Sequence, residues 1–345
     1  MASRNRQKNR QGAGVKRPRK GKAKTAAGAA IDLARYSIAV LVPCYNEEKS
    51  IAKVVADFND VLPTAAVFVF DNNSTDRTVE VARAAGAEVF TEPHQGKGNV
   101  VRRMFTDIEA DIYLLVDGDA TYDAPSAPKM IDRLLRERLD MVVGSRVDQE
   151  VAAYRAGHRT GNWLLTSFVG EVFGREVKDM LSGYRVFSRR FVKSFPVLSG
   201  GFEIETELTV HALELGLPVA EIETPYYARL EGSTSKLSTW RDGFRILFTI
   251  FKLYRAERPL RFFAMVGSLL AAVSIGLAIP IVVTYVETGL VPRLPTAVLS
   301  MGLMLLAFLS TSAGLILDTV TRGRREAKLF AYLAQRAPGE ERRRS

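Results

Sequence analysis

The chain has 345 residues, of which 47% are hydrophobic and 25% are charged, a mixture that indicates a soluble domain joined to membrane segments. Its single cysteine, Cys44, excludes an intramolecular disulfide and a cysteine-rich zinc site, and it fits a reducing compartment. The net charge of +10 comes from residues 1–24, which hold ten basic residues and no acidic one. The basic balance therefore does not argue for nucleic-acid binding, and we expect no nucleic-acid partner.

The N-terminal segment, residues 1–35, is predicted as a disordered basic tail. No apolar stretch of the kind found in a secretory signal follows its charges. Two interpretations stay open for this tail: attraction to anionic lipid headgroups, or a solvated segment without a partner.

Residues 36–239 carry alternating strand and helix patterns. Strands are expected at residues 37–42, 66–70, 88–90, 112–116 and 141–144. Helices are expected at residues 47–61, 74–86, 96–109 and 124–138. This alternation predicts a doubly wound, mostly parallel α/β sheet. No G-x-G-x-x-G follows the first strand and no G-x-x-x-x-G-K-[ST] occurs, which argues against a dinucleotide dehydrogenase and a P-loop NTPase.

Polar side chains follow successive strands of this predicted sheet. Asp117 and Asp119 come directly after the strand of residues 112–116, with Gly118 between them. Two adjacent carboxylates suit a hard cation such as Mg²⁺ or Mn²⁺, although an acidic turn that caps the next helix is the plain alternative. Asn46 and Glu47 follow the first strand and Asp71 the second. Since ligands bind at the carboxyl ends of parallel strands, we expect a nucleotide-sugar pocket at this edge.

Five ordered segments resemble those of glycosyltransferase family 2, most closely its dolichol-phosphate-mannose-synthase-like branch: Pro43-Cys-Tyr-Asn-Glu47, Asp71-Asn-Asn-Ser-Thr-Asp76, Gly96-Lys-Gly-Asn99, Asp117-Gly-Asp119 and Gly144-Ser-Arg146. The resemblance covers roughly residues 37–240. It implies a GT-A fold and an inverting transfer from a nucleotide sugar, with Asp117 and Asp119 as catalytic metal ligands. It also implies a set of donor-binding residues: Pro43, Tyr45, Asn46, Glu47, Asp71, Asn73, Lys97 and Gly118.

Two positions depart from the family pattern. Asn72 stands where relatives often have a second Asp, and Thr121 stands where a Gln would help to hold the metal.

A second group of residues is predicted to bind an acceptor phosphate. The segments Asp179-Met-Leu-Ser-Gly-Tyr-Arg185 and Tyr227-Ala-Arg229-Leu-Glu-Gly-Ser-Thr-Ser235-Lys236 are similar to acceptor-side segments of the lipid-phosphate branch. The expected ligands are Arg146, Arg185, Arg229, Ser235 and Lys236. A surface salt bridge is the alternative for each arginine. The acidic residues of Phe202-Glu-Ile-Glu-Thr-Glu207 either orient the site or favour the start of a helix.

The C-terminal third is predicted to meet the membrane. Residues 240–261 form an amphipathic pattern typical of a helix in the headgroup plane. Residues 262–285 and 294–317 carry no charge, and each is long enough to span a bilayer, so residues 262–317 are expected to form a two-helix hairpin. Basic residues lie before the first span and after the second, in the tail of residues 318–345. The positive-inside rule therefore places the catalytic domain and both termini in the cytoplasm.

The sequence therefore predicts transfer of a hexose or N-acetylhexosamine from a UDP- or GDP-sugar to polyprenyl or dolichyl phosphate. Expected partners are the nucleotide sugar, the lipid phosphate and membrane lipids, and a homo-oligomer stays open. One alternative is transfer to a hydroxyl of a glycolipid or polysaccharide, although the Gln-x-x-Arg-Trp of processive relatives is absent. Another is a non-catalytic scaffold that only binds a nucleotide sugar.

Overall fold

The computed structural model describes residues 31–148, 170, 178–201, 203–229, 248, 251–252 and 254–339. Of the predicted basic tail only residues 31–35 are included, and Leu33–Arg35 form a short 3-10 turn, η1. The predicted interfacial helix of residues 240–261 is described only at residues 248, 251–252 and 254–261, so it stays a prediction.

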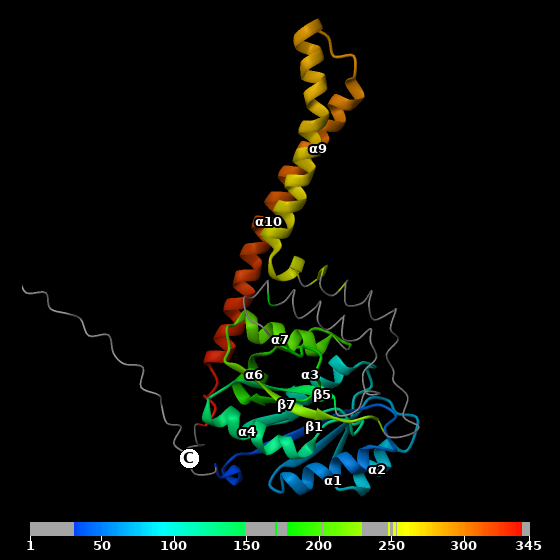
Figure 1. Cartoon of the computed structure of the whole chain (residues 1–345), viewed down its shortest axis with the longest axis vertical. Helices are drawn as coiled ribbons and strands as arrows, with labels where there is room; N and C mark the ends of the chain where they lie inside the picture. The colour runs from blue at the N-terminus through cyan, green and yellow to red at the C-terminus, as the bar shows by residue number, and fades with distance from the viewer. Residues whose placement is uncertain are drawn as a thin grey trace, which may run out of the picture. The chain divides into compact units, whose positions relative to one another are not determined.

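A seven-stranded sheet forms the centre of the N-terminal domain (Figure 1). The strands are β1 (Ile38–Cys44), β2 (Ala66–Asp71), β3 (Glu88–Thr91), β4 (Ile112–Leu115), β5 (Met141–Asp148), β6 (Arg185–Ser188) and β7 (Val219–Tyr226). They lie in the order β3-β2-β1-β4-β6-β5-β7. Among these strands β6 alone runs antiparallel to its neighbours, β4 and β5. The predicted mostly parallel sheet is confirmed, and β6 and β7 are additions to it.

Helices cover both faces of the sheet. They are α1 (Ile51–Val61), α2 (Thr78–Ala84), α3 (Lys97–Asp107), α4 (Ala127–Arg136, after the turn η2 at Ala124–Ser126), α6 (Arg189–Ser194) and α7 (Ile204–Glu214). The helices α3, α6 and α7 pack on one face (Figure 1), where Phe187 contacts both Phe105 and Phe191 in a buried cluster. The alternate residues of β1 and β4 face the other side, where α1 and α4 bury their own apolar stripes.

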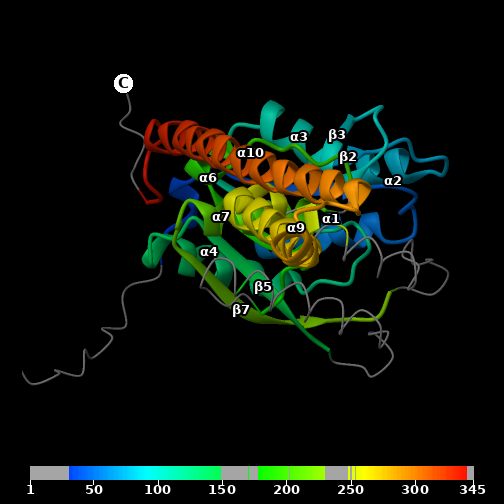
Figure 2. The same cartoon turned by 90° about the horizontal axis from the view of Figure 1, so that it is seen from above.

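Two long helices end the described chain. They are α9 (Pro259–Thr288) and α10 (Leu294–Leu333), which lie side by side as an antiparallel hairpin (Figure 2). By length and composition both could cross a membrane, and most of their apolar residues are exposed, unlike those of a core helix in a soluble protein. The helix α10 continues past the predicted span, so residues 318–333 of the predicted tail are helical.

Small residues line the contact between α9 and α10. The buried positions are Gly267 and Ser274 on α9, and Ser300, Ala307 and Gly314 on α10. The hydroxyl of Ser274 donates to the Ser300 carbonyl at 2.7 Å, and the Ser300 hydroxyl donates to the Ser274 carbonyl at 2.9 Å. Small side chains let two apolar helices approach closely without a hydrophobic drive between them.

Replacing Gly314 by Leu is expected to destabilise the hairpin. A Cβ at this position would lie 2.9 Å from the Phe263 Cβ and 3.4 Å from the Leu260 Cα, so the helices would have to separate, at a cost of about 1–3 kcal/mol or more. The measurement is the midpoint of thermal unfolding in detergent. Gly302→Leu on the same helix is the matched control, because nothing lies within 4 Å of its added Cβ. Equal midpoints for the two variants would contradict this packing.

Candidate active site

The loops that follow β1 and β2 are joined by hydrogen bonds. The Asn46 backbone N–H donates to the Ser74 hydroxyl at 2.9 Å, and the Asn46 side-chain oxygen accepts from the Thr75 N–H at 2.8 Å. Asn46 has φ 54°, a left-handed conformation that Asn tolerates better than most residues. Ser74 is thereby engaged with Asn46, and α2, predicted to begin at Ser74, begins at Thr78.

The turn after β1 is also tied to the Asp-Gly-Asp segment. The Glu47 N–H donates to the Thr78 hydroxyl at 2.8 Å, and the Ser50 hydroxyl donates to the Gly118 carbonyl at 2.7 Å. Residues 45–50 form this turn, so α1 begins at Ile51 and not at the predicted Glu47. The three predicted ligand-binding loops therefore meet at one edge of the sheet.

The Asp71 side chain at the end of β2 is buried with one oxygen unsatisfied. Its Oδ2 accepts from the Ser74 N–H at 3.2 Å, whereas Oδ1 has no hydrogen-bond partner. Cys44 pairs with Asp71 in the parallel register, so its chain neighbours Pro43 and Tyr45 lie close to Asp71. Both residues are half-buried. A buried acceptor without a donor costs about 1–3 kcal/mol. A ligand N–H or O–H is the kind of partner that would remove this cost.

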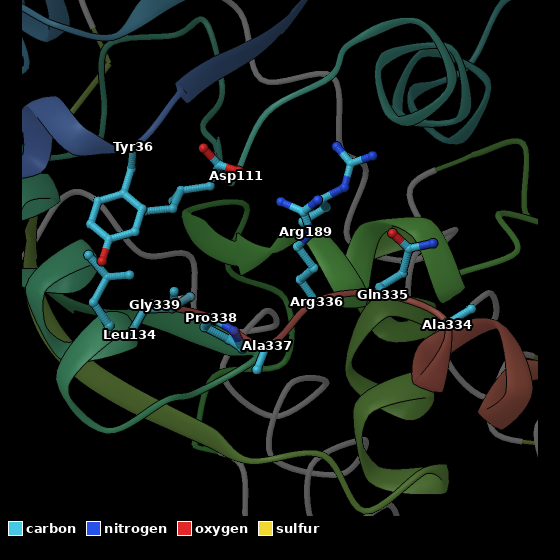
Figure 3. Close-up of a pocket in the computed structure, with 12 residues that line it drawn as sticks. Tyr36, Asp111, Leu134, Arg189, Ala334, Gln335, Arg336, Ala337, Pro338 and Gly339 are labelled. Atoms are coloured by element: carbon cyan, nitrogen blue, oxygen red, sulfur yellow. The ribbon is translucent and has the colours of Figure 1, made fainter. Parts of the chain in front are cut away.

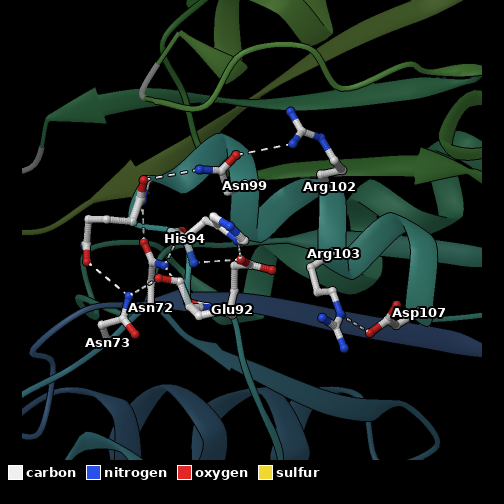
Figure 4. Close-up of polar contacts among 11 residues, drawn as sticks. Asn72, Asn73, Glu92, His94, Asn99, Arg102, Arg103 and Asp107 are labelled. Carbon is white, nitrogen blue, oxygen red and sulfur yellow. Dashed lines mark hydrogen bonds and ion pairs between the residues drawn. The ribbon is translucent and has the colours of Figure 1, made fainter.

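Two neighbouring amides hold the loop that leads to Lys97 (Figure 4). The Asn72 side chain donates to the carbonyls of Glu92 at 2.9 Å and His94 at 2.8 Å, and it accepts from the Gly96 N–H at 2.7 Å. Asn73, at φ 62°, donates to the Pro93 carbonyl at 2.7 Å. The departure at residue 72 therefore has a structural role, because an Asp could not donate either bond.

The two carboxylates of the Asp-Gly-Asp segment each pair with a cation. Asp117 accepts from the Lys97 ammonium, which also pairs with Glu205 of α7. Asp119 is buried; its Oδ1 accepts from the Thr121 hydroxyl at 2.6 Å and its Oδ2 lies 2.7 Å from the Arg229 guanidinium. Thr121, which stands where a Gln would help to hold the metal, therefore contacts one of the two carboxylates instead.

The pKa values of Asp119 and Lys97 are both raised, for different physical reasons. Burial, and then the charge of Asp117, raise the pKa of Asp119, and Arg229 opposes this shift. Burial would lower the pKa of Lys97, but the charges of Asp117 and Glu205 outweigh it and the net shift is upward. Lys97 is therefore a permanent cation between two acids.

Glycines allow the backbone to come close to the carboxylates. A Cβ on Gly183 would lie 2.6 Å from the Asp117 Oδ2, and a Cβ on Gly118 would lie 2.6 Å from the Cys44 sulfur. A side chain at either position would force its neighbour, Asp117 or Cys44, to move. Cys44 itself is buried beneath Gly118.

Three of the predicted acceptor-phosphate ligands, Arg146, Arg185 and Arg229, are among the described residues. Of these three, Arg229 is the one that contacts the pair Asp117 and Asp119. Arg146 makes two 2.8 Å hydrogen bonds to Asp179 and lies over the Tyr226 ring. Ser235 and Lys236 lie outside the described residues. Burial would raise the pKa of Asp179, but the hydrogen bonds and charge of Arg146 lower it overall, so this pair is ionised and mutually neutralised.

The prediction that Arg185 binds a phosphate is corrected. This residue starts β6 and is fully buried, and its guanidinium donates to the carbonyls of Ser182 at 2.8 Å and Met180 at 2.6 Å and to the Thr209 hydroxyl at 2.9 Å. The N–H groups of the guanidinium therefore hold the segment that carries Gly183. Because they are enclosed by protein, a phosphate could not reach them.

The acids at the start of α7 have separate roles. Glu205 pairs with Lys97, and Glu207 accepts from the backbone N–H groups of Leu198 at 3.0 Å and Ser199 at 2.9 Å. Of the two alternatives left by the sequence, Glu205 orients the site through Lys97. Asp179 begins one of the acceptor-side segments named from the sequence, but no role could be predicted for it. Its pairing with Arg146 is a long-range contact that sequence spacing does not reveal.

Comparison with known proteins identifies the family. The family model described as glycosyl transferase family 2 matches residues 39–195. Glycosyltransferase AglJ of Haloferax volcanii is 35% identical over 292 residues, which cover 84% of this chain and 95% of that protein. The chain belongs to glycosyl transferase family 2. A second relative, the dolichyl-phosphate hexose transferase of Haloferax volcanii, is 28% identical over 221 residues, which cover 64% of this chain and 95% of that protein.

Solved structures agree with the GT-A fold of this family 2 glycosyltransferase. Glucosyl-3-phosphoglycerate synthase from Mycobacterium tuberculosis, in complex with Mn²⁺, uridine diphosphate and phosphoglyceric acid, matches with a TM-score of 0.52 and 25% identity. The match covers 63% of this chain and 79% of that one. The predicted fold and family are both confirmed.

The possible metal ligands of this family 2 glycosyltransferase suit a cation that binds together with the substrate. Within the described ranges no group of three or more His, Cys, Asp or Glu side chains is placed to hold a metal ion. Mg²⁺ is commonly held by one or two carboxylates together with water and substrate phosphates. Asp117 and Asp119 supply such a pair, so the residues present fit a divalent cation completed by a diphosphate.

A cavity of about 220 Å³ lies elsewhere on the family-2 domain (Figure 3). Tyr36, Asp111, Arg189 and residues 334–339 line it. Tyr36 and Asp111 precede β1 and β4, so the cavity lies at the amino ends of these strands, whereas Asp117 and Asp119 follow the carboxyl end of β4. It is separate from the candidate active site.

Proposed function

We propose that this family 2 enzyme transfers a hexose from a nucleoside-diphosphate sugar to a polyprenyl or dolichyl phosphate, with inversion of the anomeric carbon. The observation that carries the proposal is the Asp117/Asp119 pair, held between Lys97 and Arg229 at the strand edge. The two apolar helices α9 and α10 and the relative named dolichyl-phosphate hexose transferase support a lipid acceptor.

The donor would be bound by the loops after β1, β2 and β4. The unsatisfied Asp71 Oδ1 would accept an N–H or O–H of the nucleoside. When bound, Mg²⁺ or Mn²⁺ on Asp117 and Asp119 would offset the charge of the leaving diphosphate. The solved relative that holds Mn²⁺ and uridine diphosphate supports this donor class. Lys97 places a fixed positive charge beside Asp117, where the diphosphate would lie.

The acceptor would supply its own nucleophile. A phosphate monoester is anionic near neutral pH, so positioning and charge stabilisation can replace a strong base. Arg229 is partly exposed beside Asp119 and would meet the acceptor phosphate. The roles of Ser235 and Lys236 stay predictions.

The charges that flank the hairpin support a cytoplasmic active site. Arg255, Arg258 and Arg261 lie before or within the first turn of α9, and Arg322, Arg324, Arg325 and Lys328 lie in the last third of α10. The positive-inside rule places both flanks on the cytoplasmic side, where nucleotide sugars are available to the catalytic domain.

The test is transfer of radiolabel from a panel of UDP- and GDP-sugars to polyprenyl phosphate by purified protein in lipid vesicles, with and without Mg²⁺ or Mn²⁺. We expect one donor to give an acid-labile labelled lipid, and chelation of the metal to stop its formation. If no donor labels the lipid phosphate while a hydroxyl-bearing glycolipid from crude membranes is labelled, the acceptor assignment is wrong.

A further inference from the structure

We propose that residues 324–333 of α10 dock the catalytic domain onto the membrane hairpin, and that Lys328 and Tyr332 are positioning residues for transfer to a membrane-embedded acceptor. The inference rests on the proposed function and concerns a segment that the sequence pattern placed in a basic tail. Its contacts lie outside the candidate active site.

The first contact joins α10 to the end of α7. The Lys328 ammonium lies 2.7 Å from the Glu214 Oε2, and the Glu214 side chain is 4% exposed. His211, one turn earlier, is buried between Phe191 and Phe195. Burial first, and then the charge of Lys328, lower the pKa of His211 to about 3, which agrees with a lysine held against the domain interior.

The second contact joins α10 to the region where β5 and α6 begin. The Tyr332 hydroxyl donates to the Asp140 Oδ2 at 2.9 Å, and the Asp140 side chain is fully buried. Arg190 makes two hydrogen bonds to the same carboxylate, at 2.6 and 2.9 Å, and its guanidinium lies 4.7 Å from the Tyr332 ring centre. A solvated tail would not place its side chains on two buried acids.

The chain after α10 follows the same domain. Residues 334–339 line the cavity of Figure 3 together with Tyr36, Leu134 and Arg189. The helix itself is continuous from Leu294 to Leu333, so no flexible linker separates the apolar part of α10 from its docked end. At 1.5 Å per residue its 40 residues extend about 60 Å, whereas the hydrocarbon core of a bilayer is about 30 Å thick.

The helix α7 connects the docked end to the active site. Glu205 in its first turn pairs with Lys97, and Glu214 at its last residue pairs with Lys328. Glu205 and Glu214 are nine residues apart along the helix, a distance of about 14 Å. The docking therefore fixes the orientation of the Asp117/Lys97 group relative to the membrane, which matters for an acceptor whose phosphate is held at a set depth by its lipid chain.

The test compares two acceptors in the full-length protein reconstituted in vesicles. The variant is Lys328→Met combined with Tyr332→Phe, which removes both polar contacts and keeps most of the packed volume. We expect about a tenfold or larger fall in transfer to long-chain polyprenyl phosphate in the bilayer. We expect less than a twofold change with a short-chain, water-soluble prenyl phosphate, and an unchanged Kd for the donor nucleotide.

Trypsin cleavage supplies a readout that does not depend on activity. Release of the docked end should raise the rate of cleavage after Arg324 and Arg325 several-fold in the double variant. Arg325→Met is the matched control for activity, because Arg325 is an exposed residue of the same helix and its side chain makes no hydrogen bond or ion pair with the described residues. It should transfer to both acceptors as the unaltered protein does.

A second variant guards against misfolding. Insertion of Gly-Gly-Ser between Arg322 and Gly323 keeps the docking contacts and adds a hinge, and it should lower long-chain transfer selectively. Equal losses with both acceptors, or no loss with either, would overturn the inference. If the unaltered protein uses neither phosphate acceptor, the proposed function fails. The docking is then tested by trypsin alone: faster cleavage of the double variant supports the docking, and an unchanged cleavage rate overturns it.

Discussion

Asp117→Asn should lower kcat for sugar transfer by about 10³-fold. The amide would leave Asp119 as the single carboxylate for the metal and would leave Lys97 paired with Glu205 alone. Because the Asp117 side chain is 29% exposed, the fold should persist. The measurement is the rate of transfer at saturating donor, together with the thermal midpoint of the purified variant.

Asp107→Asn is the matched control for this prediction. Asp107 ends α3 and pairs with Arg103 on the helix surface, a kind of ion pair that contributes about 0–1 kcal/mol. Its activity should stay within about twofold of the unaltered enzyme. More than a tenth of normal activity in Asp117→Asn would remove the metal role from this carboxylate.

Asn72→Asp should destabilise the domain by about 3 kcal/mol and weaken donor binding. A carboxylate at this 4% exposed position would lose both hydrogen bonds to the Glu92 and His94 carbonyls and would face their oxygens with a negative charge. The loop that leads to Lys97 would then lose its support. Thermal unfolding and the Kd for the nucleotide sugar measure the two effects.

Asn99→Asp is the comparison for Asn72→Asp. The Asn99 amide is more exposed and donates to the Gln95 carbonyl at 3.2 Å, and its replacement should cost about 0.5 kcal/mol or less. An Asn72→Asp protein as stable as the Asn99→Asp protein would show that residue 72 tolerates the Asp found in many relatives.

The edge that holds the candidate site could be predicted from local pattern. A parallel strand ends in a predictable place, and the residue after it lies at the carboxyl edge whatever the rest of the chain does. This rule locates Asp71 and Asp117, and the β1/β2 register that pairs Cys44 with Asp71 brings the loops after β1 and β2 together. The five family segments then gave these residues their chemistry.

Long-range pairing decided what local pattern could not. The strand β6 has four residues and inserts antiparallel between β4 and β5, so Arg185 enters a fully buried position although arginine is usually exposed. The partners of Lys97 and Arg229 come from other elements. The sequence places Lys328 in the predicted basic tail of residues 318–345, and the buried acid that it meets lies 114 residues away in the sequence, beyond the reach of local pattern.

The buried position of Cys44 makes this enzyme convenient for spectroscopy. It is the chain's single cysteine and is 3% exposed beneath Gly118, so thiol reagents should pass it by while the fold is intact. One cysteine introduced on the exposed face of α10 would then carry a spin label or fluorophore without prior removal of a native thiol. Slow labelling of Cys44 itself would report how often the Asp-Gly-Asp loop opens.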